Sequence, residues 1–213
     1  MAVSELHPKE EINSPETHEA EILAAIHETL NNNKEAFRVI VNQYSPLIFS
    51  LSMRMLGNKE DAEEAVQEVF IKIYSSLHRF RIGKRVLPWM YTIALNHLRT
   101  QYRNRKRRKK VEGEYQREQQ LNEEVQTKLL DPLQKIVLQE KETALMTALA
   151  DLRQEYREVF VLRVIEELSV KDVSDILHIP EGTVKTYLHR AKTKLLTQIK
   201  KKNETKKKSG RIL

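Results

Sequence analysis

Apolar residues recur three or four positions apart along most of this chain, which is the spacing that places them on one face of an α-helix. In the N-terminal half, this pattern predicts helices at residues 21–31, 35–56, 59–77 and 88–108. Pro46 is expected to kink or divide the second helix, and Gly57-Asn58 is a stop signal after it. The sequence shows no internal repeat and no pattern that predicts a β-strand.

A second periodic block covers residues 133–199, and the segments around the two blocks lack apolar periodicity. We therefore predict an all-α fold of two small helical domains joined by a linker. The expected boundaries are a disordered arm at 1–20, a first domain at 21–110, a linker at 111–132, a second domain at 133–199 and a basic, disordered tail at 200–213.

The second domain contains the pattern of a helix-turn-helix. Ser169 and Asp172 predict a capping box for a short helix at 170–177, and Pro180 suits the start of the next helix. On that next helix an inward stripe is formed by Val184, Leu188, Ala191 and Leu195. The other face and its flanks carry donors and positive charge, from Gly182, Thr183, Lys185, Thr186, His189, Arg190, Lys192 and Thr193. This arrangement predicts binding to duplex DNA, and a solvated helix of an ordinary bundle is the alternative.

The formal net charge of +7 is distributed unevenly. Residues 78–110 contain twelve Lys or Arg and no Asp or Glu, interleaved with Phe80, Trp89, Tyr91 and Tyr102. Cations bind phosphates and aromatic rings stack on unpaired bases, so this segment predicts binding to single-stranded nucleic acid. A place in the protein core is the competing interpretation for Trp89, and a solvated helix end is the alternative for residues 103–110.

Residues 59–72 have the opposite charge, with five acids against two bases. Asp61, Glu64 and Glu68 share one helical face at i, i+3 and i+7, and Gln67 borders it. DNA would repel this face, which indicates a basic protein surface as its partner. An ordinary solvated face is the alternative.

Several classes of function are not supported by the sequence. The chain has no cysteine, no apolar run long enough to span a membrane, and no secretory signal at its start. Its 7 histidines are scattered, and we find no catalytic constellation, phosphate loop or metal-ligand cluster. We expect a cytoplasmic protein that is not an enzyme and needs no cofactor or metal.

In their order along the chain, these motifs resemble those of the extracytoplasmic-function (ECF) sigma factors of RNA polymerase, over residues 37–196. Residues 58–72 are similar to the family's core-binding helix, Phe80 with residues 89–96 to its promoter-melting segment, and residues 181–192 to its second DNA-binding helix. The resemblance implies that residues 21–110 are sigma region 2 and that residues 133–199 are sigma region 4. It implies promoter recognition and transcription initiation in response to an envelope or other external stress.

The resemblance also implies roles for individual residues. Core polymerase, through the clamp coiled coil of its largest subunit, would bind Asp61, Glu64, Gln67, Glu68 and Phe70. The minus-ten element and melted strand would contact the loop at residues 79–87 and the helix after it, through Arg79, Phe80, Arg81, Lys84, Arg85, Trp89, Tyr91, Asn96, Arg99 and Arg103. The upstream minus-thirty-five element would contact Gly182, Thr183, Lys185, Thr186, His189, Arg190 and Lys192, with base recognition by Lys185, Thr186 and His189. Further implied partners are the polymerase flap and an anti-sigma factor.

Two positions depart from the family pattern. Leu152-Arg153 stands where the family often has Leu-Pro, and Thr100 replaces a frequent acid, which weakens the expectation of promoter contacts near Thr100. Two other functions also remain open. One is an autonomous helix-turn-helix regulator, which would not need the acidic helix. The other is a helical RNA-binding protein, favoured only by the basic segment.

Overall fold

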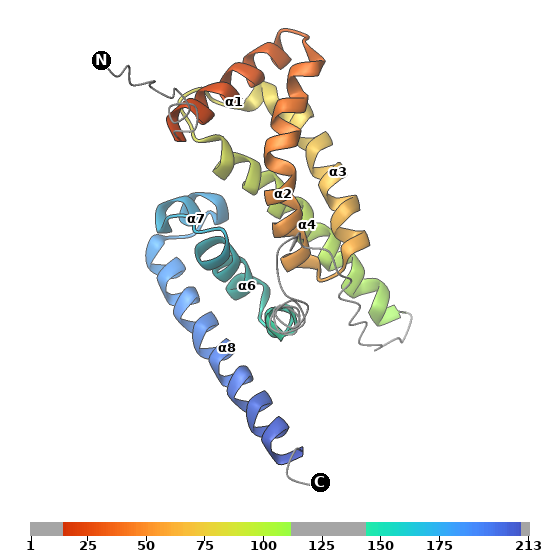
Figure 1. The fold of residues 1–213 in the computed structure, drawn as a ribbon, viewed down its shortest axis with the longest axis vertical. Helices are drawn as coiled ribbons and strands as arrows, with labels where there is room; N and C mark the ends of the chain where they lie inside the picture. The colour runs from red at the N-terminus through yellow and green to blue at the C-terminus, as the bar shows by residue number, and fades with distance from the viewer. Residues whose placement is uncertain (1–14, 112–143, 210–213) are drawn as a thin grey trace, which may run out of the picture.

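The computed structural model describes residues 15–111 and 144–209, and all the regular elements within those ranges are helical. Figure 1 shows two groups of helices, an N-terminal unit of α1 to α4 and a C-terminal unit that ends in α8. The prediction of an all-α fold with two helical domains is confirmed. The predicted linker lies almost entirely outside the described residues, as do residues 133–143 of the predicted second domain.

The N-terminal unit is built around α2. Its helices are α1 (Pro15–Leu30), α2 (Phe37–Leu56), α3 (Lys59–Ser76) and α4 (Val86–Val111), with short 3-10 turns at Lys34–Ala36 and Leu77–Arg79. Helix α2 packs against the other three helices, and α3 also packs against α4. The apolar stripes meet in a core that includes Ile40, Ile48, Leu51, Met55, Val69, Ile73, Met90 and Leu98, each at most 1 % exposed.

Local signals set the sharp boundary between α2 and α3. Gly57 ends α2 in the left-handed conformation, with φ 73°, which a residue without a Cβ adopts at little cost. The side chain of Asn58 then accepts a hydrogen bond from the Asp61 backbone N–H at 2.8 Å and caps α3. The predicted helix stop at Gly57-Asn58 is confirmed.

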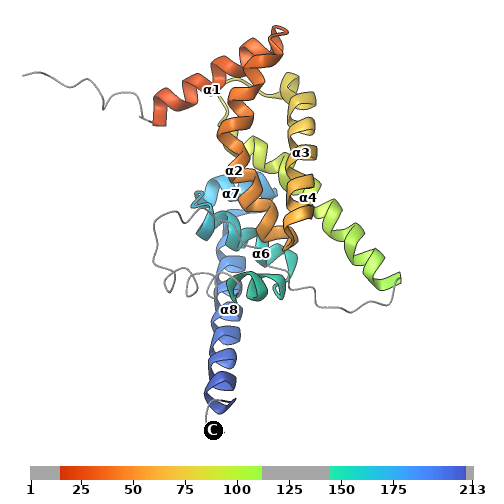
Figure 2. The same cartoon turned by 45° about the vertical axis from the view of Figure 1, so that its right-hand side comes forward.

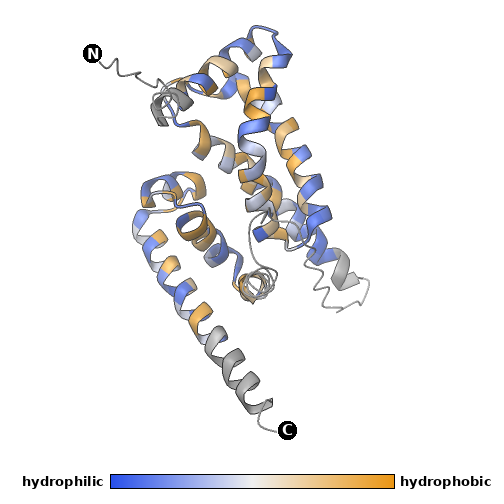
Figure 3. Ribbon diagram, in the orientation of Figure 1, coloured by the Kyte–Doolittle hydropathy of each residue, from blue (hydrophilic) through white to orange (hydrophobic). Residues whose placement is uncertain are grey.

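The C-terminal unit contains a helix at residues 144–150, then α6 (Gln154–Phe160), a π-helical segment (Val161–Ile165), α7 (Val170–Leu177) and α8 (Glu181–Ser209). Helix α8 packs against α6 and α7, and its C-terminal half then extends away from both units (Figures 1 and 2). Along the first half of α8, hydrophobic and hydrophilic residues alternate as an amphipathic helix requires (Figure 3).

Several sequence-based boundaries are wrong. The predicted disordered arm is too long, because α1 begins at Pro15, and proline suits the first turn of a helix. The predicted disordered tail is helical as far as Ser209, because its Lys and Glu residues are good helix formers and its first glycine comes at 210. Pro46 does not divide α2, and its exposed position leaves the carbonyl that loses its donor close to solvent. Helix α4 begins at Val86, so the predicted loop at 79–87 is helical at both ends.

The two units contact each other. Helix α7 packs against α4. Arg157 of α6 is 3 % exposed and donates a hydrogen bond from Nη1 to the carbonyl oxygen of Met55 at the end of α2, at 3.0 Å. Its guanidinium also lies 5.2 Å from the centre of the Tyr102 ring on α4. The described helices therefore form one continuous assembly.

Candidate functional site

The acidic face of α3 is divided into an engaged end and a free end. Glu64, Gln67 and Glu68 are exposed. Asp61 is only partly exposed, because its carboxylate accepts a hydrogen bond from Arg105 Nη1 on α4 at 2.5 Å. Phe70, also predicted to bind polymerase, is 6 % exposed and packs edge-on against Phe37, with 6.4 Å between the ring centres. The structure thus leaves Glu64, Gln67 and Glu68 available to a partner.

An open groove lies beside this acidic face, between α2 and α3. Its volume is about 460 Å³, and its lining consists of Ser45, Pro46, Phe49, Glu63, Val66 and Gln67. Gln67 belongs to both the groove and the acidic face. One surface therefore offers carboxylates and, next to them, a partly apolar recess.

The basic segment begins in the loop between α3 and α4. Arg79, Arg81, Lys84 and Arg85 are exposed, and so is Ile82, at 84 %. Gly83 has a φ of +89°, a left-handed conformation that L side chains rarely adopt. The loop is therefore a basic protrusion with an apolar tip.

The aromatic residues of this segment are less accessible than the sequence suggested. Phe80 is 9 % exposed and contacts the partly buried Trp89 edge-on, with 5.1 Å between the ring centres. Tyr91 is fully buried. In this arrangement Phe80 and Tyr91 belong to the core, and their predicted contacts with melted DNA stay predictions.

On α4, the predicted promoter-strand residues share one stretch of helix. Asn96 and Arg103 are exposed, and Arg99 lies between them. Arg99 Nη1 donates a long hydrogen bond to Asn96 Oδ1, at 3.4 Å, and Arg103 Nε donates to the Arg99 carbonyl oxygen at 3.3 Å. The three side chains thus form a connected polar row.

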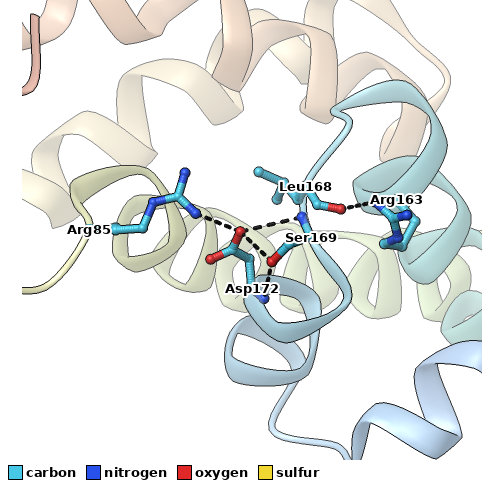
Figure 4. Close-up of polar contacts among 5 residues, drawn as sticks. All are labelled: Arg85, Arg163, Leu168, Ser169 and Asp172. Atoms are coloured by element: carbon cyan, nitrogen blue, oxygen red, sulfur yellow. Dashed lines mark hydrogen bonds and ion pairs between the residues drawn. The ribbon is translucent and has the colours of Figure 1, made fainter. Parts of the chain in front are cut away.

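The helix-turn-helix has the predicted geometry. Ser169 caps α7 through Oγ, which accepts from the Asp172 backbone N–H at 3.0 Å, and the Asp172 carboxylate accepts from the Ser169 N–H at 3.3 Å (Figure 4). Both halves of the capping box are present. His178 ends α7 in the left-handed conformation, and the turn to Pro180 leads into α8. The predicted capping box is confirmed.

The outward face of α8 is the most open of the predicted surfaces. Val184, Ala191 and Leu195 are buried as predicted, and Leu188 is partly buried. Among the predicted DNA-binding residues, those that are exposed are Gly182, Lys185, Thr186, His189, Arg190 and Lys192, while Thr183 is partly exposed. A Cβ added at Gly182 would meet nothing within 4 Å, so packing inside the protein does not require a glycine there.

One residue of this face is held by its own unit. Arg190 Nη1 donates to the phenolic oxygen of Tyr156 at 3.3 Å, and this contact lowers the pKa of Tyr156. Arg190 is therefore oriented from α6, whereas Lys185, His189 and Lys192 extend from α8 and form no hydrogen bond or ion pair with another helix among the described residues. This difference favours a contact between Arg190 and the DNA backbone over a contact with a base.

The basic segment of the N-terminal unit meets three carboxylates of the C-terminal unit. Arg99 donates from Nε and Nη2 to the two oxygens of Glu158, at 2.8 and 2.7 Å. Tyr91 Oη donates to Glu166 at 2.6 Å, and Arg85 Nη1 donates to Asp172 at 2.6 Å (Figure 4). Three predicted promoter contacts are therefore occupied by acids that lie 59 to 87 residues away in the sequence.

In each pair the pKa of one partner is shifted, namely that of Arg99, Tyr91 or Asp172. Hydrogen bonding to Glu158 raises the pKa of Arg99, against the effect of burial. Burial and the Glu166 charge raise the pKa of Tyr91 far above its usual range, so the phenol stays protonated and donates. Burial would raise the pKa of Asp172, but the hydrogen bonds from Ser169 and Arg85 together lower it. Asp172 is therefore held as a carboxylate.

Sequence reasoning missed this contact between the units because no local pattern marks it. Glu166 follows the π-helical segment, where its backbone N–H donates to the Val161 carbonyl oxygen at 2.9 Å, and Glu167 then has a φ of 53°. This wide turn brings Glu166 to Tyr91 and to Ser50, whose Oγ donates to it at 3.0 Å. Glu158 has no such signal either, since it stands between Arg157 and the apolar residues 159–162, as any charged residue on a helix surface could.

Other kinds of site find no support in the parts of the chain that the structure describes. Residues 15–111 and 144–209 contain no group of three or more His, Asp or Glu placed to hold a metal ion. No helix among the described residues is both long and apolar enough to cross a membrane.

Comparisons with known proteins match both units. Residues 40–108 match the family model Sigma-70 region 2, and residues 142–195 match Sigma-70, region 4. The ECF RNA polymerase sigma factor SigW of Bacillus subtilis is 32 % identical over 177 residues, covering 82 % of this chain and 95 % of that protein. The ECF RNA polymerase sigma-E factor of Haemophilus influenzae is 28 % identical, covering 83 % and 94 %.

Solved structures show the same fold. CnrH in complex with the cytosolic domain of CnrY matches with a TM-score of 0.61 at 20 % identity, covering 86 % of this chain and 97 % of that one. The sigma factor RpoE in complex with the anti-sigma factor NepR, from Bartonella quintana, matches with a TM-score of 0.63 at 23 % identity, covering 77 % and 96 %. At these identities the likeness concerns the fold.

Proposed function

The chain belongs to the ECF family of RNA polymerase sigma factors, and from this premise we propose how its surfaces divide the work of transcription initiation. As a sigma factor, the protein directs core polymerase to promoters. We assign polymerase docking to α3, capture of the melted minus-ten strand to the loop at 80–85 with α4, and recognition of the minus-thirty-five element to α8. The assignment of residues 21–110 to sigma region 2 and of residues 133–199 to sigma region 4 becomes part of this proposal.

The observation that carries the proposal is the opposite charge of two exposed helical faces. Glu64 and Glu68 make the exposed face of α3 acidic, whereas Lys185, Arg190 and Lys192 make that of α8 basic. A DNA-binding protein that acts alone has no use for the first face. A basic surface, such as the one we propose on the clamp coiled coil, would complement it.

On α8 the exposed side chains suit a major groove. A helix-turn-helix inserts the start of its second helix, where Gly182 leaves room for a close approach and Lys185, Thr186 and His189 follow on the outer face. We propose base contacts for these three, and backbone contacts for Thr183, Arg190 and Lys192. The C-terminal unit would also contact the polymerase flap.

Promoter opening in this scheme uses binding energy alone. Arg79, Arg81, Lys84 and Arg103 are exposed cations that would bind phosphates of the displaced strand. We propose that the protein catalyses no reaction, and that its affinity for unpaired bases favours the melted state. An anti-sigma factor and an external stress signal, both common in the family, would control when the protein is available.

Reconstituted transcription tests this function. The purified chain, core polymerase and genomic promoter fragments are combined, and the transcripts are mapped. We expect initiation at defined sites only when chain and polymerase are both present. Tight and specific duplex binding by the chain alone, with no effect on initiation, would instead establish the autonomous regulator.

A further inference from the structure

The contact between the two units engages three side chains on the proposed strand-binding side of the N-terminal unit, of which Arg85 stays 60 % exposed. Arg85, Tyr91 and Arg99 each bind a carboxylate of the C-terminal unit, from Asp172, Glu166 and Glu158 respectively. We propose that this contact is autoinhibitory: the three acids occupy the strand-binding side of the N-terminal unit until the units separate. The inference rests on the proposed role of α4 in strand capture.

The chemistry of the contact resembles that of a nucleic acid. A guanidinium binds the two oxygens of a carboxylate in the same parallel fashion as two oxygens of a phosphate. Glu158 presents such a pair to Arg99, at 2.8 and 2.7 Å. While that pairing lasts, the two Arg99 nitrogens that face Glu158 cannot bind a phosphate.

Burial distinguishes this contact from an ordinary surface ion pair. The side chain of Glu158 is 4 % exposed and that of Arg99 is 27 % exposed. Gln154 adds a third hydrogen bond to the Glu158 carboxylate, at 2.8 Å. DNA therefore cannot reach Arg99 Nε by displacing a mobile side chain, because the helix that carries Glu158 has to move with it.

Glu166 extends the contact to α2. Its two oxygens accept hydrogen bonds from Tyr91 Oη at 2.6 Å and from Ser50 Oγ at 3.0 Å. Arg54 in turn donates to Ser50 Oγ at 2.7 Å. Glu166 is thus held by hydrogen bonds from side chains of the N-terminal unit. Such a network favours one orientation of the two units relative to each other.

The device leaves the duplex-binding face of the protein free. Lys185, Thr186 and His189 on α8 remain exposed while Arg99 and Tyr91 are covered. A closed chain could thus meet the upstream element but not hold a melted strand. Separation of the units by core polymerase would couple strand capture to assembly of the complete enzyme.

Removal of the charges of Glu158, which is buried, and Glu166, which is partly buried, tests the proposal in the full chain. The variant Glu158→Gln/Glu166→Gln keeps the shape of both side chains and removes their charges. The matched control is Glu155→Gln/Glu167→Gln, which removes two charges at neighbouring positions; both are exposed, and Glu155 pairs with Arg153 of its own unit. Because the chain has no cysteine, Ser75→Cys and Thr197→Cys place one dye on each unit for energy transfer.

We expect the wild type and the control to show the same high energy transfer, and the test variant to show less. The test variant should bind a short single-stranded DNA oligonucleotide about tenfold more tightly than the control, equivalent to about 1.4 kcal/mol. Circular dichroism establishes that both variants are helical. Energy transfer and affinity that match those of the control would overturn the inference.

A covalent link between the two units tests the proposal in the opposite direction, because it holds the contact closed and does not weaken it. Ser50→Cys/Glu166→Cys replaces two side chains that are in contact, and a short bis-thiosulfonate linker that reductant cleaves joins them. With core polymerase and promoter DNA, the linked chain should lose at least about tenfold in initiation and recover when the linker is cleaved. Equal initiation before and after cleavage refutes autoinhibition, whereas a wild-type chain that never initiates refutes the sigma function itself.

Discussion

Asp61 and Arg105 form an ion pair between the start of α3 and the C-terminal part of α4, with 2.5 Å between Oδ2 and Nη1. The same Nη1 donates to the carbonyl oxygen of Leu56 at 3.3 Å. Asp61 therefore fastens α4 to the turn between α2 and α3. Its carboxylate stabilises the fold, so the proposed docking of this helix on polymerase depends more on Glu64 and Glu68, which are exposed.

Charge reversal at Glu64 and Glu68 should abolish docking without unfolding the protein. For Glu64→Lys/Glu68→Lys we expect a loss of affinity for core polymerase of at least about tenfold, because like charges would oppose each other at the interface. The free energy of unfolding should change by less than about 1 kcal/mol, since both side chains are exposed.

The matched control for this experiment is Glu19→Lys/Glu21→Lys on α1. It makes the same change in net charge at two other exposed acids. Titration of labelled chain with core polymerase gives the affinities, and urea unfolding gives the stabilities. Unchanged affinity in the α3 variant would show that α3 is not the docking helix.

On α8, His189 and Lys192 should have different effects on promoter choice. Replacement of His189 by Ala should change the preference among upstream elements, by about 1–3 kcal/mol if the imidazole contacts a base. Replacement of Lys192 by Ala should weaken binding to all elements about equally, as expected for a phosphate contact. Binding to a library of upstream sequences distinguishes the two. A uniform loss in the His189 variant would assign that residue to the backbone as well.

The sequence predicted the parts of the fold that depend on neighbouring residues. The Gly57-Asn58 stop and the Ser169-Asp172 capping box involve residues at most three positions apart, and the structure contains both. The sequence predicts the helix ends that lack such caps less accurately. The highly charged ends of α1 and α8 looked disordered by composition, but the helix propensity of their residues prevails.

The contacts between the units could not be predicted in this way. Arg99 and Glu158 are 59 residues apart, and Arg85 and Asp172 are 87 apart, so no periodicity relates them. The π-helical turn that positions Glu166 also has no sequence signal of its own. The sequence therefore identifies the candidate residues on α4 from their chemistry. It does not predict that Tyr91 and Arg99 are hydrogen-bonded to acids of the C-terminal unit.

Arg157 should stabilise both the C-terminal unit and its contact with the end of α2. It is 3 % exposed and donates to three carbonyl oxygens, those of Met55 at 3.0 Å, Ala150 at 2.7 Å and Leu152 at 3.3 Å. Replacement by Met would leave buried acceptors without a donor, and we expect the free energy of unfolding to fall by about 2–3 kcal/mol.

Arg153→Met is the control for Arg157, because the Arg153 side chain is 65 % exposed and its pair with Glu155 is open to solvent. Its loss should cost less than about 1 kcal/mol. Urea unfolding followed by circular dichroism measures both variants. Equal losses would mean that the Arg157 hydrogen bonds stabilise the fold no more than an exposed ion pair does.

The stability of the N-terminal unit should fall in mild acid because of His97. This partly buried imidazole lies on α4, and its Nε2 is buried and without a hydrogen-bond partner among the described residues. Burial, with the Lys72 charge, lowers the pKa of His97 more than Glu68 and Glu64 raise it. The unfolded chain therefore takes up a proton near its ordinary pKa of about 6.5, whereas the folded chain does so only at lower pH.

Between these two pKa values the unfolded state binds more protons, so the free energy of unfolding decreases as the pH falls. The contribution of neutral His97 is fully present above about pH 7 and declines as the pH falls below about 6.5, towards the lowered folded pKa. His97→Gln should reduce this slope in urea unfolding curves recorded across that range. His189→Gln, at an exposed site on α8, should keep it. If both variants retain the wild-type slope, another group causes the acid sensitivity.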